Sequence, residues 1–371
     1  MNLQKHLDRM PVGYPATESG VELRILEQLF TPEEAEVAVQ LSMVGEPIGR
    51  IYKRINKKVK SQDELQKILE RMEHKGTLLE SNVKGKTFYK NAPFAIGTWE
   101  FQVDRLTPSL INDFEEYIRK EFGQELAGTG IPQLRTVPVG KSIPLPDKYP
   151  VSDYDIIRNI IENNNGQMAV ANCICRQAND LIGKPCSVTD LRQTCLMLAP
   201  DAAQHYINLG IAEAVSKEKI LEILDKAQEN GLVIQPTNSK RAEAVCCCCG
   251  DCCGILKNAK KYPRPADLYA SNFYAEADIN LCSGCGTCVD RCQLNAATLV
   301  NGIISINLDR CIGCGNCVVV CPSEAVRLKK KEKEIIPPKN MTAMEITILS
   351  KKVGLIGMLK IALAMFMKKK I

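Results

Sequence analysis

Two stretches, "NLCSGCGTCVDRC" at Asn280–Cys292 and "DRCIGCGNCVVVC" at Asp309–Cys321, repeat one pattern with a period of 29 residues. Each stretch reads Cys-x2-Cys-x2-Cys-x3-Cys, and Pro322 follows the second. Between them, "TLVNGIISI" predicts a β-hairpin, because Asn301-Gly302 tolerates the positive φ angles of a type I′ turn. The repeat therefore predicts a small module with two matching halves and eight thiols.

This repeated pattern closely resembles that of bacterial two-cluster ferredoxins, over about residues 278–330. In that family each closely spaced triplet binds one [4Fe-4S] cluster, and the fourth cysteine binds the other cluster. The resemblance implies that cluster 1 is bound by Cys282, Cys285, Cys288 and Cys321, and cluster 2 by Cys311, Cys314, Cys317 and Cys292. Gln293 stands where the family often has proline, a difference that removes no ligand. Four-thiolate zinc is the alternative, but zinc ribbons do not show this doubled pattern.

Cysteine is the unusual feature of the composition, with 18 among 371 residues. None precedes Cys173, and ten lie between Cys173 and Cys253. The N-terminal "MNLQKHLDRMPVGYP" has no apolar stretch typical of a secretory signal, so we expect a cytoplasmic location. In that reducing compartment, many cysteines indicate metal or redox chemistry rather than disulfides. The net charge of +5 does not indicate a nucleic-acid partner, and three scattered histidines do not indicate histidine ligation.

The ten central cysteines predict further metal centres. Four come from one local stretch and could complete a cubane or a tetrahedral zinc site, and the neighbouring ferredoxin pattern favours the cubane: Cys173, Cys175, Cys186 and Cys195. In "AVCCCCGDCCG" at 244–254, Cys246, Cys249 and Cys252 have the spacing of a ferredoxin loop. Cys248 and Cys253 are further candidate ligands beside them. Cys247 is predicted to pack as a small apolar residue without a ligand role.

The number of central clusters is left open by this count. Ten thiols suffice for two cubanes, but they could instead hold one unusual cluster with more than four protein ligands, or with one iron open to chemistry. We therefore expect at least two [4Fe-4S] clusters in the chain, and three or four in all. The Cys-Cys-Gly tripeptides at 248–250 and 252–254 resemble those of heterodisulfide reductases, although that family separates its tripeptides widely and follows them with Cys-x2-Cys.

Arg176 follows the first central cysteines directly. Its guanidinium could offset the negative charge of a cluster or donate hydrogen bonds to sulfur. An ordinary surface salt bridge is the alternative.

The whole sequence predicts an α+β chain of several domains. Residues 1–97 carry four helical patterns, with capping boxes at Thr31 with Glu34 and Ser61 with Glu64, and then two extended runs around Lys84-Gly85. This arrangement resembles a winged helix domain. Residues 98–253 predict a mixed α/β cysteine-rich domain, including a helix capped by Ser152. Residues 254–277 are expected to be a linker, 278–330 the ferredoxin-like domain, and 331–371 a linker and an apolar, basic C-terminal helix.

The tail at Val353–Met367 is apolar but short. Its 15 residues would form a helix of about 22 Å, against a hydrocarbon core of about 30 Å, so it is not expected to span a membrane. It could lie at a membrane surface, anchored by Lys368–Lys370. Docking of this helix on the protein itself or on a partner subunit is the preferred interpretation.

These patterns together predict a low-potential iron–sulfur electron-transfer protein of an anaerobe. The full combination resembles a poorly characterised group of ferredoxin-like proteins of anaerobic microbes, which implies redox protein partners or a larger oxidoreductase complex and no particular substrate. One alternative is a redox enzyme subunit whose central cluster acts on a thiol or disulfide. Another is a redox-sensing DNA-binding regulator, which the slightly acidic helix expected at Ser61–Lys75 disfavours.

Overall fold

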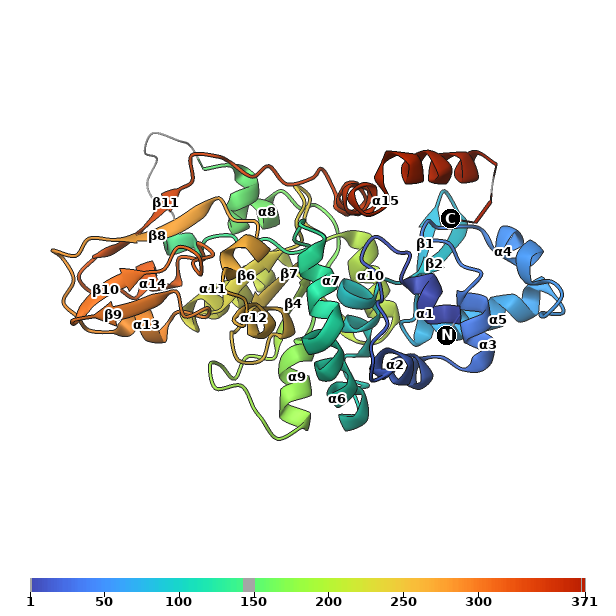
Figure 1. Ribbon diagram of the computed structural model, residues 1–371, viewed down its shortest axis with the longest axis horizontal. Coiled ribbons are helices and arrows are strands. Elements are labelled where there is room, and N and C mark those ends of the chain that lie inside the picture. Colours follow the sequence, from blue (N-terminus) through green and yellow to red (C-terminus); the bar gives the residue numbers. More distant parts are fainter. Residues whose placement is uncertain (1, 143–150, 368, 371) are drawn as a thin grey trace. The chain divides into compact units, whose positions relative to one another are not determined.

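The computed structural model describes residues 2–142, 151–367 and 369–370 of an α+β protein (Figure 1). The chain divides into two compact units. Unit 1 comprises Met1–Thr129, Gln204–Ala212 and Glu345–Ile371, and unit 2 comprises Gly130–Ala203 and Glu213–Met344.

Unit 1 begins with a helical segment followed by a hairpin, as the sequence predicts for residues 1–97. Its elements are α1 (Asn2–Leu7), α2 (Val21–Leu29), α3 (Pro32–Ala38), α4 (Ile48–Ile55), α5 (Gln62–His74), β1 (Leu78–Val83) and β2 (Lys86–Asn91). Thr31 and Glu34 form the expected reciprocal capping box on α3. Ser61 caps α5 by accepting from the Glu64 backbone, whereas the Glu64 carboxylate accepts from the Lys60 backbone instead. Lys84 and Gly85 both have positive φ where the hairpin turns.

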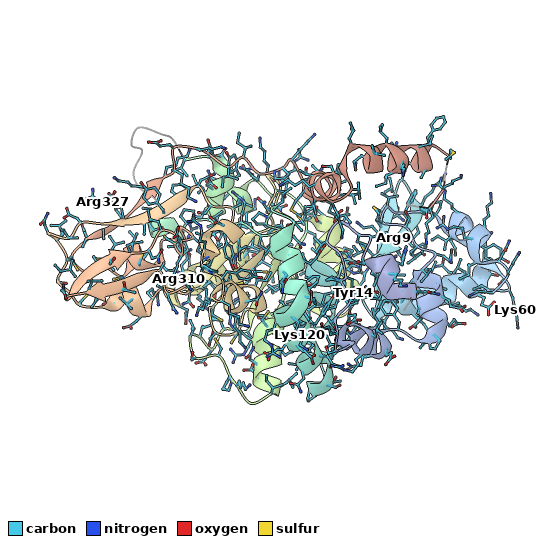
Figure 2. All side chains as sticks on the ribbon, viewed as in Figure 1. Arg9, Tyr14, Lys60, Lys120, Arg310 and Arg327 are labelled. Atoms are coloured by element: carbon cyan, nitrogen blue, oxygen red, sulfur yellow. The ribbon has the colours of Figure 1, made fainter. Side chains whose placement is uncertain are left out.

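Unit 1 continues past the expected boundary at residue 97 through α6 (Pro108–Tyr117) and α7 (Gly123–Gly128). The Arg24 guanidinium on α2 lies 2.9 Å from the Asp113 carboxylate on α6. Behind this ion pair, Tyr14 (Figure 2) packs its ring against Phe94 and Tyr117, with centroid distances of 4.9 and 4.8 Å. Residues on both sides of position 97 therefore share one aromatic core.

The C-terminal helix α15 (Met341–Phe366) is interrupted at Gly354, where φ is 65°. Beyond this break the apolar side chains face solvent, and Leu355 and Phe366 are 78% and 85% exposed. The expected docking of this segment on the protein itself is therefore not observed in the described residues. No helix among them is both long enough and apolar enough to cross a membrane. Lys370 contacts the Val39 carbonyl, and Lys368 lies outside the described residues.

Unit 2 is built on a five-stranded sheet in the order β5-β3-β4-β7-β6. Its strands are β3 (Met168–Asn172), β4 (Gln193–Met197), β5 (Ala212–Val215), β6 (Val233–Pro236) and β7 (Ala244–Cys248). Its helices are α8 (Ile157–Glu162), α9 (Ile174–Leu181), α11 (Lys217–Glu229) and α12 (Gly254–Ala259). Helix α10 (Pro200–Asn208) belongs to unit 2 only up to Ala203 and to unit 1 from Gln204. β4 runs antiparallel to both β3 and β7, and β6 runs antiparallel to β7. One face of the sheet packs on α8 and α11, which supply Ile157, Ile220 and Leu224 to a common core.

The helix expected from Ser152 begins later than the sequence indicates. Asp153–Asp155 form a 3-10 turn, and Ser152 donates its hydroxyl to Glu334 instead of capping a helix. The buried Asp155 carboxylate accepts from Arg135 and from Asn272, each at 2.8 Å. These two partners come from distant segments and hold Asp155 outside the helix, so α8 starts only at Ile157.

The ferredoxin-like part of unit 2 contains two antiparallel strand pairs and two short helices. These are β8 (Phe273–Ala277), β9 (Ala297–Val300), β10 (Ile303–Ile306), β11 (Val326–Lys330), α13 (Thr287–Asp290) and α14 (Asn316–Val319). β9 and β10 form the expected hairpin, with φ of 52° at Asn301 and 78° at Gly302. β8 pairs with β11 along its whole length. The expected linker at 254–277 thus contains both α12 and a strand of this module.

Candidate metal centres

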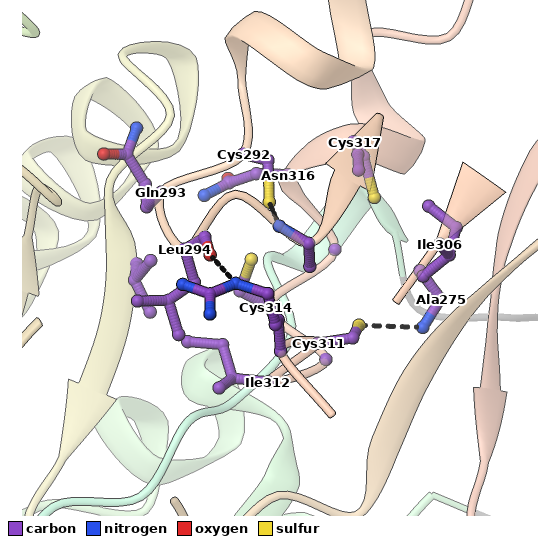
Figure 3. A pocket seen from close by; sticks show the side chains of 16 residues that line it. Ala275, Cys292, Gln293, Leu294, Ile306, Cys311, Ile312, Cys314, Asn316 and Cys317 are labelled. Carbon is purple, nitrogen blue, oxygen red and sulfur yellow. Dashed lines mark hydrogen bonds between the residues drawn. The ribbon is translucent and has the colours of Figure 1, made fainter. Parts of the chain in front are cut away.

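The residues that the ferredoxin resemblance assigns to cluster 2 line one pocket (Figure 3). Cys292 comes from the first repeat, whereas Cys311, Cys314 and Cys317 come from the second. Backbone N–H groups donate to two of the sulfurs: Ala275 to Cys311 at 3.3 Å, and Ala296 to Cys292 at 3.1 Å. Burial raises the pKa of Cys314 to about 12. A cationic iron core would replace the thiol protons at such a site.

The residues assigned to cluster 1 also come together, beside the β9–β10 hairpin. Burial raises the pKa of Cys288, and the charges of the Cys321, Cys285 and Cys282 thiolates raise it further. The Cys282 sulfur accepts backbone hydrogen bonds from Gly284 and Ile304, both at 3.4 Å. Cys285 is exposed to solvent, unlike any assigned cysteine of cluster 2. The cluster 1 site is therefore the more accessible of the two.

The first half of the central cysteine run is a β-strand rather than a ferredoxin loop. Alternate residues of β7 point to opposite faces of the sheet, because the side-chain period of a strand is two. Val245 and Cys247 enter the core beneath α8 and α11. Cys246 and Cys248 face the other way and pack with Leu256 of α12. Cys246 therefore packs in a different core from Cys249 and Cys252, which the sequence predicts to share one loop.

Six thiols form a continuous chain of contacts on the face of Cys246 and Cys248. The contacts run from Cys173 to Cys175, then to Cys253, Cys248, Cys246 and Cys195. We call these residues the six-thiol set. Cys195 on β4 pairs directly with Cys246 on β7. Hydrogen bonds from the Cys175 and Cys248 thiols lower the pKa of Cys253.

The remaining central ligand candidates are Cys186, Cys249 and Cys252, which we call the three-thiol set. All three pack against the core beneath α8 and α11. Cys186 thus joins residues more than sixty positions later in the chain. Its closeness in sequence to Cys173, Cys175 and Cys195 suggests that it lies with them, but the structure does not place it there. Cys247 is 1% exposed and belongs to neither set, and burial raises its pKa.

Arg176 on α9 is completely buried and lies between the two sets. Its guanidinium donates to the Thr194 hydroxyl at 2.6 Å and to the Cys247 carbonyl at 2.8 Å. Burial by itself would lower the pKa of Arg176, but the charges of the Cys173, Cys249, Cys248 and Cys186 thiolates outweigh burial and raise it. The alternative of an ordinary surface salt bridge is therefore wrong, since Arg176 is buried against cysteine thiols.

Three buried polar groups around the six-thiol set have an atom without a hydrogen-bond partner among the described residues: the Arg176 Nε, the Gln235 side-chain amide and the Tyr269 hydroxyl. Gln235 pairs with Cys246 across the sheet. Burial, and then the charges of the Cys253 and Cys248 thiolates, raise the pKa of Tyr269. An orphaned buried polar group is costly. These atoms and the soft sulfur donors therefore fit a bound iron–sulfur cluster whose sulfurs accept hydrogen bonds.

Sequence reasoning missed Gln235, Tyr269 and Asp251. Gln235 and Tyr269 join the six-thiol set only through strand register and the fold, so no local signal marks them. Asp251, in contrast, lies inside the cysteine run, and a search for carboxylate ligands would have found it.

The six-thiol set and the cluster 2 site share one apolar core. Cys248, Cys253, Leu294 and Ile312 are buried together in it, and Cys314 packs against it. Val233 on β6 lines the cluster 2 cavity and also pairs with Cys248. Arg310 (Figure 2) donates hydrogen bonds to the Leu294 and Lys260 carbonyls, both at 3.0 Å. These bonds link the ferredoxin module to the segment that contains Lys260. Val233 therefore belongs to the surroundings of both sites.

Gln293 also joins the module to the cysteine run. Its side-chain oxygen accepts from the buried Gly250 backbone N–H at 2.7 Å. The position where ferredoxins often have proline thus carries a contact to the Cys249–Cys252 segment, and proline could not supply that acceptor.

Replacing Gln293 with alanine is expected to lower the free energy of unfolding by about 1–3 kcal/mol, because the Gly250 N–H would remain buried without an acceptor. No candidate ligand changes, so the iron content should equal that of the wild type. Denaturant unfolding under anaerobic conditions measures the effect. The exposed Gln204→Ala is the matched control and should stay within about 0.5 kcal/mol of the wild type. Equal stabilities of the two variants would contradict this role for Gln293.

Comparison with known proteins identifies one region of the chain. Residues 275–322, which contain both repeats, match the family described as a 4Fe-4S dicluster domain. Neither the curated proteins nor the solved structures give a match. This match and the many cysteines support an iron–sulfur electron-transfer role. The C-terminal part of the chain is therefore a ferredoxin-type 4Fe-4S dicluster domain.

Proposed function

We propose that this chain is an electron-transfer protein whose ferredoxin module exchanges electrons between a redox protein partner and a further iron–sulfur cluster held by the six-thiol set. Bound clusters supply low-potential one-electron transfer. The observation that supports this proposal is the shared apolar core, in which Cys314 packs against the same side chains as Cys248 and Cys253. A site for an isolated structural metal would not need this proximity to the module.

The exposure of the thiols gives the proposed path a direction. Cys285 is exposed, whereas Cys311, Cys248 and Cys253 are buried. A redox partner would therefore exchange electrons at the cluster 1 site. The charge of the Cys288 thiolate contributes to the raised pKa of Cys317, so the two ferredoxin sites are neighbours. Electrons would then pass from cluster 1 through cluster 2 to the six-thiol set.

A redox enzyme subunit is the second candidate function. The six-thiol set has two more donors than a cubane requires. The Tyr269 hydroxyl and the Gln235 amide, both buried and without partners among the described residues, lie beside these thiols. A thiol or disulfide substrate bound at this cluster would use such hydrogen-bonding groups. A shift of the cluster's paramagnetic resonance signal on addition of a small disulfide would favour the enzyme over the carrier.

A DNA-binding regulator is not favoured by the N-terminal helices and hairpin. On α5, Arg71 pairs with Glu33 at 2.5 Å and Lys75 pairs with Glu34 at 2.7 Å. These ion pairs occupy basic groups that a recognition helix would offer to phosphates and bases. We propose instead that this winged-helix-like segment serves as a protein docking module.

Cysteine variants of the full chain, purified without oxygen, test the proposed central cluster. The wild type should contain about 12 or more iron atoms, against about 8 for the ferredoxin pair alone. A variant in which Cys246, Cys248 and Cys253 are all changed to serine keeps three thiols of the set, too few for a cubane, and should lose about four iron atoms while the signals of the ferredoxin clusters remain. Cys247→Ser is the matched control, because Cys247 is buried in the other core, and it should keep the full count. Wild-type iron content in this triple variant, or only about 8 atoms in the wild type, would contradict the proposal.

A further inference from the structure

The three-thiol set has a fourth donor, and the four donor atoms are compact. The sulfurs of Cys186, Cys249 and Cys252 and one carboxylate oxygen of Asp251 all lie within 4.8 Å of one another. The Cys186 and Cys249 sulfurs are 3.6 Å apart, and the Cys186 sulfur lies 3.7 Å from the Asp251 Oδ1.

These separations match the ligands of a single tetrahedral ion. With zinc–sulfur bonds of about 2.3 Å and zinc–oxygen bonds of about 2.1 Å, two thiolates on one tetrahedral zinc stand about 3.8 Å apart, and a thiolate and an oxygen about 3.6 Å apart. The thiolates of a cubane bind four different irons and must stand farther apart around the whole cluster. The donor set is also mixed, since a carboxylate replaces the fourth thiolate that cubanes ordinarily use.

The Asp251 carboxylate is held in the orientation that such a site requires. Its other oxygen, Oδ2, accepts from the Ser187 backbone N–H at 2.8 Å and from the Ser187 hydroxyl at 2.9 Å. Hydrogen bonds of this kind fix a metal-binding carboxylate and leave its free oxygen for the ion. Ser187 follows Cys186 directly, so one loop supplies both a ligand and the group that orients another.

We propose that Cys186, Cys249, Cys252 and Asp251 form a mononuclear tetrahedral zinc site, separate from the iron–sulfur centres. Four protein donors close the coordination shell, which is the arrangement of structural rather than catalytic zinc. The site joins the irregular segment between α9 and β4, which contains Cys186, to the loop that follows β7. Its role is to fix the Cys249–Cys252 loop, whose Gly250 contacts the ferredoxin module through Gln293.

Metal analysis of the full chain, purified without oxygen from zinc-containing medium, tests this site. The wild type should hold about one zinc per chain. Cys186→Ser should lower the zinc content at least about fivefold and leave iron and sulfide unchanged. Cys175→Ser, a change in the six-thiol set, should leave the zinc content unchanged. A wild type without zinc, or a Cys186→Ser variant that loses iron, would overturn the proposal. The iron count of the triple serine variant at 246, 248 and 253 tests the six-thiol cluster separately, so the two proposals can fail independently.

Zinc X-ray absorption of the wild type keeps the proposal testable if Cys186→Ser fails to fold. The expected shell is three sulfurs at about 2.3 Å and one oxygen at about 2.0–2.2 Å. Asp251→Cys should convert this shell to four sulfurs. A four-sulfur shell in the wild type would overturn the assignment of Asp251.

Discussion

Replacing Arg176 with methionine is expected to destabilise the chain by about 3–5 kcal/mol and to lower the potential of the central cluster, because the change removes a buried positive charge. The guanidinium is completely buried, and its nearest charges are the thiolates of Cys173, Cys249 and Cys248. No ion pair of Arg176 with a carboxylate is found in the part of the chain that the structure describes. The loss would therefore leave thiolate charge buried without compensation.

The expected fall in potential follows from the charge of the reduced cluster. Reduction adds one negative charge, which a nearby cation stabilises. At an effective dielectric constant of about 20, a unit charge about 8 Å away contributes about 2 kcal/mol. For one electron this energy corresponds to about 90 mV, at 59 mV for each tenfold change. The potentials of the two ferredoxin clusters should change much less, because Arg176 contacts none of their cysteines.

Anaerobic redox titration and denaturant unfolding of the full chain measure both effects. Arg176→Lys keeps the charge but loses the two-pronged contact to Thr194 and the Cys247 carbonyl, so it should retain most of the potential and less of the stability. Arg158→Met is the control, since Arg158 is an exposed partner of Asp225 and such a pair contributes about 0–1 kcal/mol. If the methionine variants at 176 and 158 behave alike, Arg176 does not compensate cluster charge.

The ferredoxin module could be predicted from the sequence because its sites are local. Each triplet of cysteines spans seven residues, so spacing alone brings the thiols together once the loop folds around a cluster. The same holds for the capping box at Thr31 and the turn at Asn301-Gly302, each of which needs only a few neighbouring residues. Spacing is reliable information wherever the interacting groups belong to one turn or loop.

The central sites could not be predicted in the same way, because strand pairing decides their membership. Cys195 meets Cys246 only through the register of β4 with β7. Within β7 the period of two sends Cys246 and Cys247 to opposite cores, although they are adjacent in sequence. Grouping by sequence distance combines Cys186 with Cys173, Cys175 and Cys195, whereas the structure brings its sulfur next to that of Cys249. Interpreting "AVCCC" as a strand would have assigned Cys246 and Cys247 to opposite faces of the sheet. It would not have identified which strand pairs with this one.

The boundaries of the compact units also depend on distant contacts. The aromatic core around Tyr14 includes Phe94 and Tyr117, which lie on either side of the expected boundary at 97. In the expected linker at 254–277, Pro263 and Pro265 suggest irregular chain, yet β8 begins at Phe273 because β11 provides its partner strand. A composition-based boundary cannot include a strand whose partner is more than fifty residues away.

Gly250→Ala is expected to be the most damaging single-methyl change in the cysteine run. A Cβ at this position would lie 2.2 Å from the Gln293 carbonyl oxygen and 2.6 Å from the Lys260 Nζ. The lysine side chain can move aside, but the carbonyl belongs to the backbone of the ferredoxin module. The loop must therefore move away from the module, which also stretches the hydrogen bond from the Gly250 N–H to the Gln293 side chain. We expect a loss of about 2–4 kcal/mol in the free energy of unfolding.

This change should also weaken the connection between the module and the six-thiol set, because Cys248 and Cys253 flank the displaced loop. In a rapid-mixing experiment with a low-potential reductant, the ferredoxin clusters should be reduced at the wild-type rate and the central cluster more slowly. The matched control is Gly128→Ala at the end of α7, where an added Cβ meets no atom within 4 Å. It should leave the kinetics unchanged and alter stability by less than about 1 kcal/mol. Reduction of the central cluster at the wild-type rate in Gly250→Ala would mean that electrons do not reach it from the module side.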